Sequence, residues 1–143
     1  MNKVDLTYLC VPPLRAVRIP EHLNAFRCLV LIEREIDDDL RQAVSEQLVA
    51  SGCLYMMAWG IDCGLWDESV DQASLKAFDY ADIPDDHFIM TTWHEKNTLQ
   101  DAVFFAKYCA THSYAGDLIS KMLILDFHDV DRSKKIAELF DKS

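Results

Sequence analysis

Three side chains in the middle of the chain could form a nucleophilic centre. Cys63 stands in the stretch G-I-D-C-G-L-W-D-E, and His94 and Glu95 end the stretch T-T-W-H-E. A thiol near the start of a helix ionises more easily, and an imidazole within hydrogen-bond reach can act as its base. Cys63, His94 and Glu95 are therefore the catalytic candidates. The acidic neighbours Asp62 and Asp67 oppose this role, because negative charge raises the pKa of a thiol.

Some of these residue types also bind metal ions. His94, Asp126 and His128 carry imidazole and carboxylate groups, which suit Zn, Mn or Fe. Asp126 and His128 are two residues apart, so on a strand they would face the same side of a sheet. No H-E-x-x-H or comparable signature accompanies them, and G-I-D-C-G lacks the G-x-G-x-x-G spacing of a nucleotide-binding loop. We expect no metal and no cofactor, and these three residues are the weak candidates for a metal site.

The three tryptophans of the chain, Trp59, Trp66 and Trp93, stand close to these groups in the sequence. Large aromatic side chains are often simply buried in a core. Tryptophan is also enriched in the residues that dominate protein interfaces. Both interpretations stay open, and the acids around the three indoles favour recognition.

The composition excludes some partners and favours others. Among 143 residues, 24 are acidic and 14 are Lys or Arg, which gives a formal net charge of −10. Nucleic acids and anionic membranes are bound through clustered Lys and Arg, so we expect neither as a partner. An acidic surface suits a basic protein partner, whose approach it accelerates.

The cysteines and the N-terminus point to a reducing compartment. The five cysteines are odd in number and form no C-x-x-C pair. The first residues, M-N-K-V-D-L-T-Y-L-C, contain an early Asp and no long apolar run, so they do not resemble a signal peptide. No stretch approaches the ~18 apolar residues of a membrane span. We therefore expect a cytoplasmic protein.

Strands and helices alternate along residues 26–143, which we expect to form one α/β domain. Apolar runs of strand length occupy 26–33, 53–59, 87–93 and 122–127, and amphipathic helical segments follow each of them. Capping signals mark the helices: three aspartates before Leu40, Gly52 after the first helix, Thr98 with Asp101 before the third, and Asp131 before the last.

This alternation predicts a three-layer sandwich with four mostly parallel strands between helices. The flavodoxin-like strand order 2-1-3-4 is the commonest small arrangement of this kind. Three prolines interrupt the first 25 residues, so residues 1–25 are predicted to be an extended arm. An edge strand around Leu6–Val11 could add to the sheet in the antiparallel direction.

Parallel strands bring their carboxyl ends to one edge of the sheet, where ligands bind in such folds. All three tryptophans, two histidines and many carboxylates follow the four predicted strands. We therefore predict that one rim of the sheet carries the binding residues, which are Trp59, Asp62, Trp66, Asp67, Trp93, His94, Asp126 and His128.

The stretches W-G-I-D-C-G-L-W-D-E-S-V-D and F-D-Y-A-D-I-P-D-D-H-F-I-M-T-T-W-H-E resemble a family of bacterial proteins described as an uncharacterised domain of unknown function. The resemblance covers roughly residues 26–127. It implies a bacterial origin and implies that the Trp-rich rim is a trait of the family. It implies no activity, cofactor or partner.

The leading hypothesis is a small acidic cytosolic protein that binds a basic protein through its Trp- and carboxylate-rich rim, as immunity and antitoxin proteins do. The alternative is a small hydrolase or transferase that uses Cys63 with His94, or a metal bound by His and Asp, at the same rim. A third hypothesis is a homodimer that uses Phe104, Phe105 and Tyr108, because two adjacent phenylalanines on a helix cannot both face one core.

Overall fold

The computed structural model describes residues 5–13, 16–20, 23–112 and 119–143. It contains one sheet of five parallel strands in the order β1-β5-β2-β3-β4. The strands are β1 (Asp5–Cys10), β2 (Phe26–Ile32), β3 (Cys53–Gly60), β4 (Met90–His94) and β5 (Lys121–Phe127). The predicted α/β class, the single domain and the parallel direction of the four strands are confirmed.

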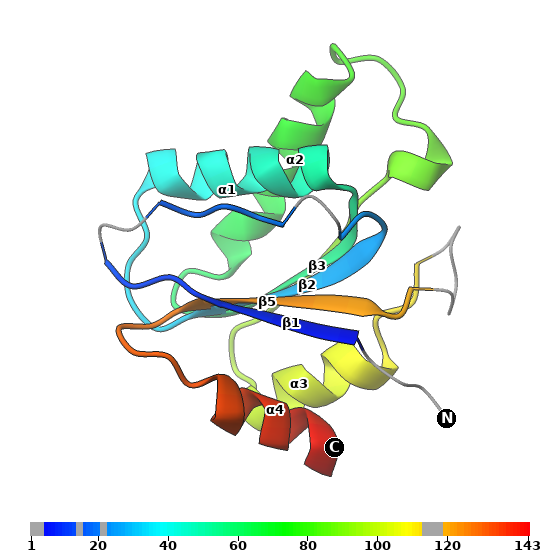
Figure 1. Cartoon of the computed structure of the whole chain (residues 1–143). Coiled ribbons are helices and arrows are strands. Elements are labelled where there is room, and N and C mark those ends of the chain that lie inside the picture. The colour runs from blue at the N-terminus through cyan, green and yellow to red at the C-terminus, as the bar shows by residue number, and fades with distance from the viewer. Residues whose placement is uncertain (1–4, 14–15, 21–22, 113–118) are drawn as a thin grey trace.

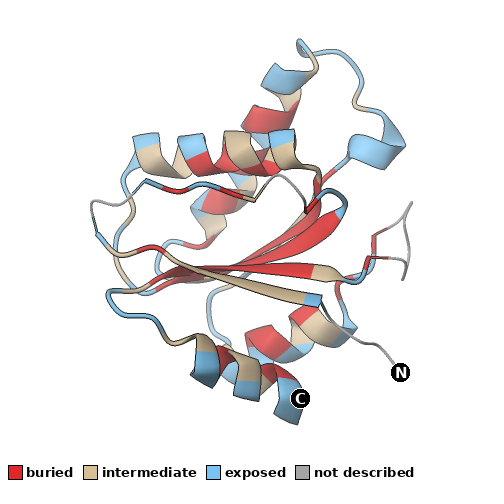
Figure 2. Ribbon diagram, in the orientation of Figure 1, coloured by how far each residue is buried: buried red, intermediate tan, exposed pale blue. Residues whose placement is uncertain are grey.

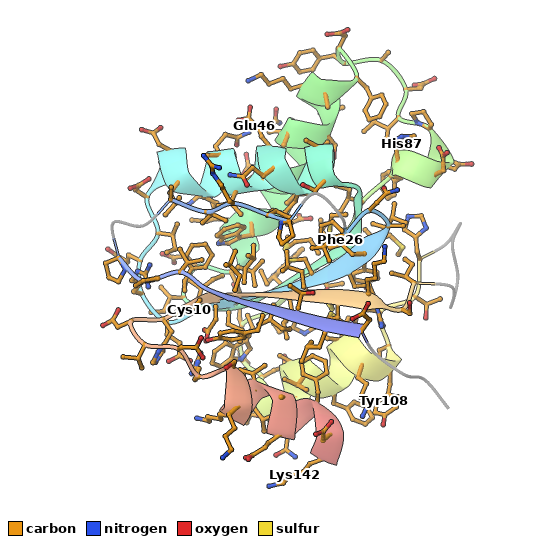
Figure 3. All side chains as sticks on the ribbon, in the orientation of Figure 1. Cys10, Phe26, Glu46, His87, Tyr108 and Lys142 are labelled. Atoms are coloured by element: carbon orange, nitrogen blue, oxygen red, sulfur yellow. The ribbon has the colours of Figure 1, made fainter. Side chains whose placement is uncertain are left out.

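Helices cover both faces of this sheet (Figure 1). One face carries α1 (Asp38–Ser51) and α2 (Gly64–Ala77), and the other carries α3 (Leu99–Tyr108) and α4 (Ser133–Lys142). Apolar side chains pack in two clusters, one on each face, because the central strands are buried on both sides. Figure 2 shows this burial along β2, β3 and β5 and on the inward sides of the helices. The result is the expected three-layer sandwich.

The capping signals of the sequence act largely as expected. The side chain of Asp37 accepts a hydrogen bond from the backbone N–H of Leu40, and Gly52 ends α1 in the left-handed conformation with φ of 90°. Thr98 and Asp101 form the reciprocal capping box at the start of α3. Asp131 instead precedes the capping residue Arg132, although its carboxylate still accepts a hydrogen bond from the N–H of Ser133.

The predicted strand order 2-1-3-4 is wrong. It places residues 87–93 inside the sheet and 122–127 at its edge, whereas the structure places β5 inside and β4 at the edge. The composition of the two strands explains the difference. The apolar β5 has all but one of its residues buried, whereas β4, with the sequence M-T-T-W-H, has none that is fully buried. An edge position suits the more polar strand.

Two further boundaries differ from the expectation. The strand predicted at 87–93 begins only at Met90, because residues 85–87 form a short 3₁₀ turn, η1 (Asp85–His87). The N-terminal edge strand exists as β1, but it pairs with β5 in the parallel direction and not in the antiparallel one. After β1 the arm contributes Val11, Val17 and Leu23 to the core beneath α1.

Candidate functional site

The register of the sheet brings several predicted site residues into one row at the carboxyl edge. Asp126 on β5 pairs with Leu31 on β2, Leu31 pairs with Trp59 on β3, and Trp59 pairs with His94 on β4. Paired residues of parallel strands point to the same face, so this row faces the layer of α3 and α4. Strands lie about 4.8 Å apart, which places Asp126 roughly 14 Å from His94. Asp126 and His94 therefore lie at the same edge of the sheet but are too far apart to form one site.

An ion-pair network occupies the part of this edge next to β5. The guanidinium of Arg132 makes two hydrogen bonds to the carboxylate of Asp126, at 2.7 and 2.9 Å, and pairs with Glu33 at 2.6 Å. The hydroxyl of Tyr8 donates a hydrogen bond of 2.5 Å to the same Asp126 carboxylate. Asp126 itself is completely buried. Its oxygens therefore accept hydrogen bonds from groups inside the protein, and Asp126 is not accessible to an external ligand.

The pKa shifts in this network agree with a permanent internal ion pair. Burial, and then the hydrogen bond to Asp126, raise the pKa of Tyr8 well above its ordinary value, so the phenol stays protonated. The hydrogen bond to Asp126 also raises the pKa of Arg132, which stays charged. The network is a structural link between β1, β2, β5 and the start of α4.

His128 lies at the outer side of this network and does not form a metal site with Asp126. Its Nδ1 lies 3.0 Å from the carbonyl oxygen of Val130, and its Nε2 lies 3.9 Å from Glu33. Within the described ranges, no three His, Cys, Asp or Glu side chains are grouped as metal ligands would be. The weak metal candidates His94, Asp126 and His128 are thus not brought together.

Cys63 and His94 lie close in the backbone but on opposite faces of the sheet. The Cys63 thiol is fully buried in the core under α1 and α2. The His94 imidazole packs on Phe105 of α3, with ring centres 4.7 Å apart, and its Nε2 lies 3.0 Å from the hydroxyl of Thr92. The structure therefore does not pair this thiol with its proposed base.

The pKa of each group fits this separation. Burial raises the pKa of Cys63, and the charge of Glu95 raises it further, against the hydrogen bond from the backbone of His94. Burial lowers the pKa of His94. The thiol is protonated at neutral pH, and a protonated thiol is a poor nucleophile.

The three tryptophans have three different environments. Trp66 is 1% exposed and packs on Phe127 in the core, with ring centres 5.7 Å apart. Trp59 is half-buried and donates its indole N–H to the carbonyl of Asn97 at 2.8 Å. Trp93 is 48% exposed. Of the three tryptophans, only Trp93 is classed as exposed, which the sequence alone does not reveal.

The turn from β3 to α2 lies against the ring of Trp93. Gly60 has φ of 111°, and a Cβ at this position would lie 2.0 Å from the carbonyl oxygen of Ile32, so only glycine fits. The turn then places Gly64 against the Trp93 ring, 3.6 Å from the position of a Cβ. The stretch G-I-D-C-G is thus a strand-to-helix turn that ends beside an exposed indole.

Exposed apolar and acidic side chains surround this turn. Ile61 and Leu65 are each 44% exposed, and the carboxylates of Asp62, Glu68 and Glu95 are also exposed. We call this surface the acidic rim: Ile61, Asp62, Leu65, Glu68, Trp93 and Glu95. Ile61, Leu65 and Glu68 are the members that the predicted site residues did not include, because their exposure depends on the shape of the turn.

The remaining predicted residues lie beside this surface. The Asp67 carboxylate accepts a hydrogen bond from the hydroxyl of Thr91 on β4. On the outside of α3, Phe104 is 51% exposed and its ring packs at a tilt against that of Tyr108, with ring centres 4.9 Å apart, whereas Phe105 packs inward on Tyr55. The homodimer through Phe104, Phe105 and Tyr108 stays a prediction.

Comparisons with known proteins place the chain in a family. The model of a domain of unknown function, DUF7684, matches residues 6–143, so the match begins within β1 and includes all four helices. No curated protein and no solved structure matches the chain. No helix in the described part of the chain is long and apolar enough to cross a membrane. The chain belongs to the DUF7684 family, a domain of unknown function.

Proposed function

We propose that this protein binds a basic protein partner through the acidic rim, as immunity and antitoxin proteins bind theirs. The observation that carries the proposal is Trp93, a 48% exposed indole between carboxylates. Its indole N–H forms no hydrogen bond with any described residue, so it is available to a partner. Tryptophan with adjacent apolar contacts is a frequent centre of protein interfaces.

The charges of the rim specify the chemistry of the partner. Asp62, Glu68 and Glu95 form no ion pair within the described residues, and the whole chain carries a net charge of −10. Unpaired surface carboxylates attract Lys and Arg side chains and accelerate their approach. A basic protein is therefore the partner that this surface fits best.

The buried groups of the edge support binding rather than chemistry. The Cys63 thiol is buried, and the Asp126 carboxylate is neutralised by Arg132. All five cysteines are free thiols, which supports our expectation of a cytoplasmic location.

Affinity purification with the tagged chain, followed by binding measurements on the purified partner, tests this proposal. We expect Trp93→Ala to weaken binding by roughly 30-fold, the effect of losing one interface hot spot. Phe104→Ala is the matched control, because Phe104 is equally exposed but lies on α3. An acidic partner, or one that binds the Trp93→Ala and wild-type proteins equally well, would contradict the proposal.

A further inference from the structure

Among the described residues, β4 is an edge strand whose own sequence lacks the features that usually prevent further pairing. Its sequence M-T-T-W-H contains no proline and no lysine, and its register with β3 runs from Met90 to His94 without a bulge. Prolines, lysines and bulges are the devices by which natural edges avoid an added strand. β-branched and aromatic side chains in β4 favour extended pairing.

An apolar pocket of about 260 Å³ lies between the start of β4 and the side of α2. Phe88, at its mouth, is 48% exposed and is held in place by the His112 ring nitrogen, 2.6 Å from the Phe88 carbonyl. The pocket suits one aliphatic or aromatic side chain. It is lined by Asp71, Ser74, Leu75, Ile83, Phe88 and Ile89.

Two carboxylates continue this pocket along α2. Asp67 and Asp71 are one helical turn apart, and neither forms an ion pair with any described residue. The hydroxyl of Thr91 bonds to Asp67, which shows that this side of α2 faces β4. Burial, and then the charge of Asp67, raise the pKa of Asp71. A cation between the two carboxylates would relieve this repulsion.

The spacing on α2 matches that of a strand. Asp67, Asp71 and Leu75 follow each other at intervals of four residues, or about 6 Å along a helix axis. Alternate side chains of a strand are about 6.6 Å apart. A strand beside β4 would therefore place every second side chain opposite one of these three positions.

We propose that the edge of β4 receives an extended segment of the basic partner as a sixth strand, with two basic side chains at Asp67 and Asp71 and an apolar side chain in the pocket at Leu75. The pairing of main chains supplies affinity, and alternate side chains supply specificity. This inference rests on the proposed function and adds how the partner binds. A second copy of this chain fits poorly, because it would bring the same carboxylates together.

The test is a selection of random ten-residue peptides, displayed on phage, against the full chain. We expect enrichment of peptides with two basic residues and one apolar residue at alternate positions. The synthetic form of the most enriched peptide should bind Asp71→Lys at least tenfold more weakly than wild type. Glu138→Lys, the same charge change at an exposed position on α4, should alter the affinity less than twofold. N-methylation of alternate peptide nitrogens should also abolish binding.

The results separate this inference from the proposed function. One result would overturn the sixth strand and keep the proposed function. In that result, basic peptides bind the Trp93→Ala variant more weakly than wild type, but bind the Asp71→Lys and Asp71→Asn variants as tightly as wild type. Enriched peptides without an excess of basic residues overturn the sixth strand, and so does a selection that enriches nothing. The proposed function is overturned separately, by a partner that binds the Trp93→Ala and wild-type proteins equally well. Circular dichroism of each variant shows that it is folded.

Discussion

The carboxylate of Asp126 shows how burial decides what a residue can do. In the sequence it follows an apolar run and precedes His128, a spacing typical of a ligand pair. In the structure it is completely buried and shared between Arg132 and Tyr8. The charge is tolerated because two hydrogen bonds from one guanidinium and one from a phenol replace its hydration.

Removal of Arg132 should therefore strongly destabilise the fold. Arg132→Met leaves a buried carboxylate without its cation, which typically costs about 3–5 kcal/mol of unfolding free energy. Urea denaturation monitored by circular dichroism measures the loss. The control is Lys76→Met, because Lys76 pairs with Glu46 on the surface, and this variant should change little. Equal effects of the two substitutions would contradict a structural role for the network.

His94 should make the stability dependent on pH. Burial lowers its pKa in the folded protein below the value of 6.5 for an unfolded chain. Below pH 6.5 the unfolded state therefore binds more protons than the folded state, and stability falls as the pH falls towards the folded pKa. The single protonation of His94 can lower the free energy of unfolding by at most about 1.4 kcal/mol per pH unit.

Denaturation of wild type and His94→Gln between pH 8 and pH 5 tests this expectation. The two curves should keep a constant difference above pH 7.5, where the imidazole is neutral in both states, and the wild type should lose more stability below pH 6.5. A constant difference over the whole range would refute it. The C2–H resonance of His94 in an NMR titration gives the folded pKa directly.

The exposure of single residues could be predicted only in part. The sequence identified the residues of the carboxyl edge, and Trp59, Asp126 and His94 do share one row of the sheet. It could not indicate that Trp66 and Cys63 point into the core, since this depends on how α2 rotates after the turn. Nor could it pair Asp126 with Arg132, because Arg132 lies outside any regular pattern.

At the scale of elements, the turn from β3 to α2 determines the shape of the rim. Its first glycine passes so close to the end of β2 that the N–H of Ile61 donates a hydrogen bond of 2.9 Å to the carbonyl of Ile32. A side chain at Gly60 would collide with that same carbonyl. Gly64 is different, because it lies in α2 and has ordinary distances to Trp93 and Glu95.

The two glycines should respond differently to substitution. Gly60→Ala adds a backbone clash to the ~1–2 kcal/mol cost of a left-handed conformation, so we expect a loss of several kcal/mol. Gly64→Ala should be neutral or gain up to about 1 kcal/mol, since alanine favours helix. Thermal unfolding compares them. Similar melting temperatures for the two variants would show that the turn can adopt another path.

Elements with local signals were predicted well, and their order was not. The caps at Asp37, Gly52 and Thr98 depend on neighbours in the chain, so the sequence contains them in full. The strand order depends on contacts between distant segments, which no local pattern encodes. The polar composition of β4, with two threonines and a histidine, was the available signal that this strand lies at the edge.

At the scale of the whole molecule, the direction of the helices adds to the acidity of one side. Parallel strands return through helices that begin near the carboxyl edge, and three of the four helix starts carry acids: Asp37, Asp38 and Asp39 at α1, Asp67 at α2, and Asp101 at α3. These acids are favoured by the helix dipoles. The fold itself therefore places negative charge along the carboxyl edge of the sheet.

The rate of association with the basic partner should depend on salt concentration. This dependence should distinguish the effect of charges in the acidic rim from the effect of the net charge of the whole chain. Glu95→Lys and Glu138→Lys each change the net charge by two, but Glu138 lies on α4 and outside the rim. At 10 mM salt the Debye length is about 30 Å, so both substitutions should slow association. At 150 mM it is about 8 Å, and only Glu95→Lys should still slow association, because Glu138 is then screened from the approaching partner. Stopped-flow measurements at the two salt concentrations give these rates. If Glu95→Lys and Glu138→Lys lowered the association rate equally at 150 mM salt, the partner would approach another surface. A partner that contacts the acidic rim should be affected more by the charge at Glu95 than by the charge at Glu138.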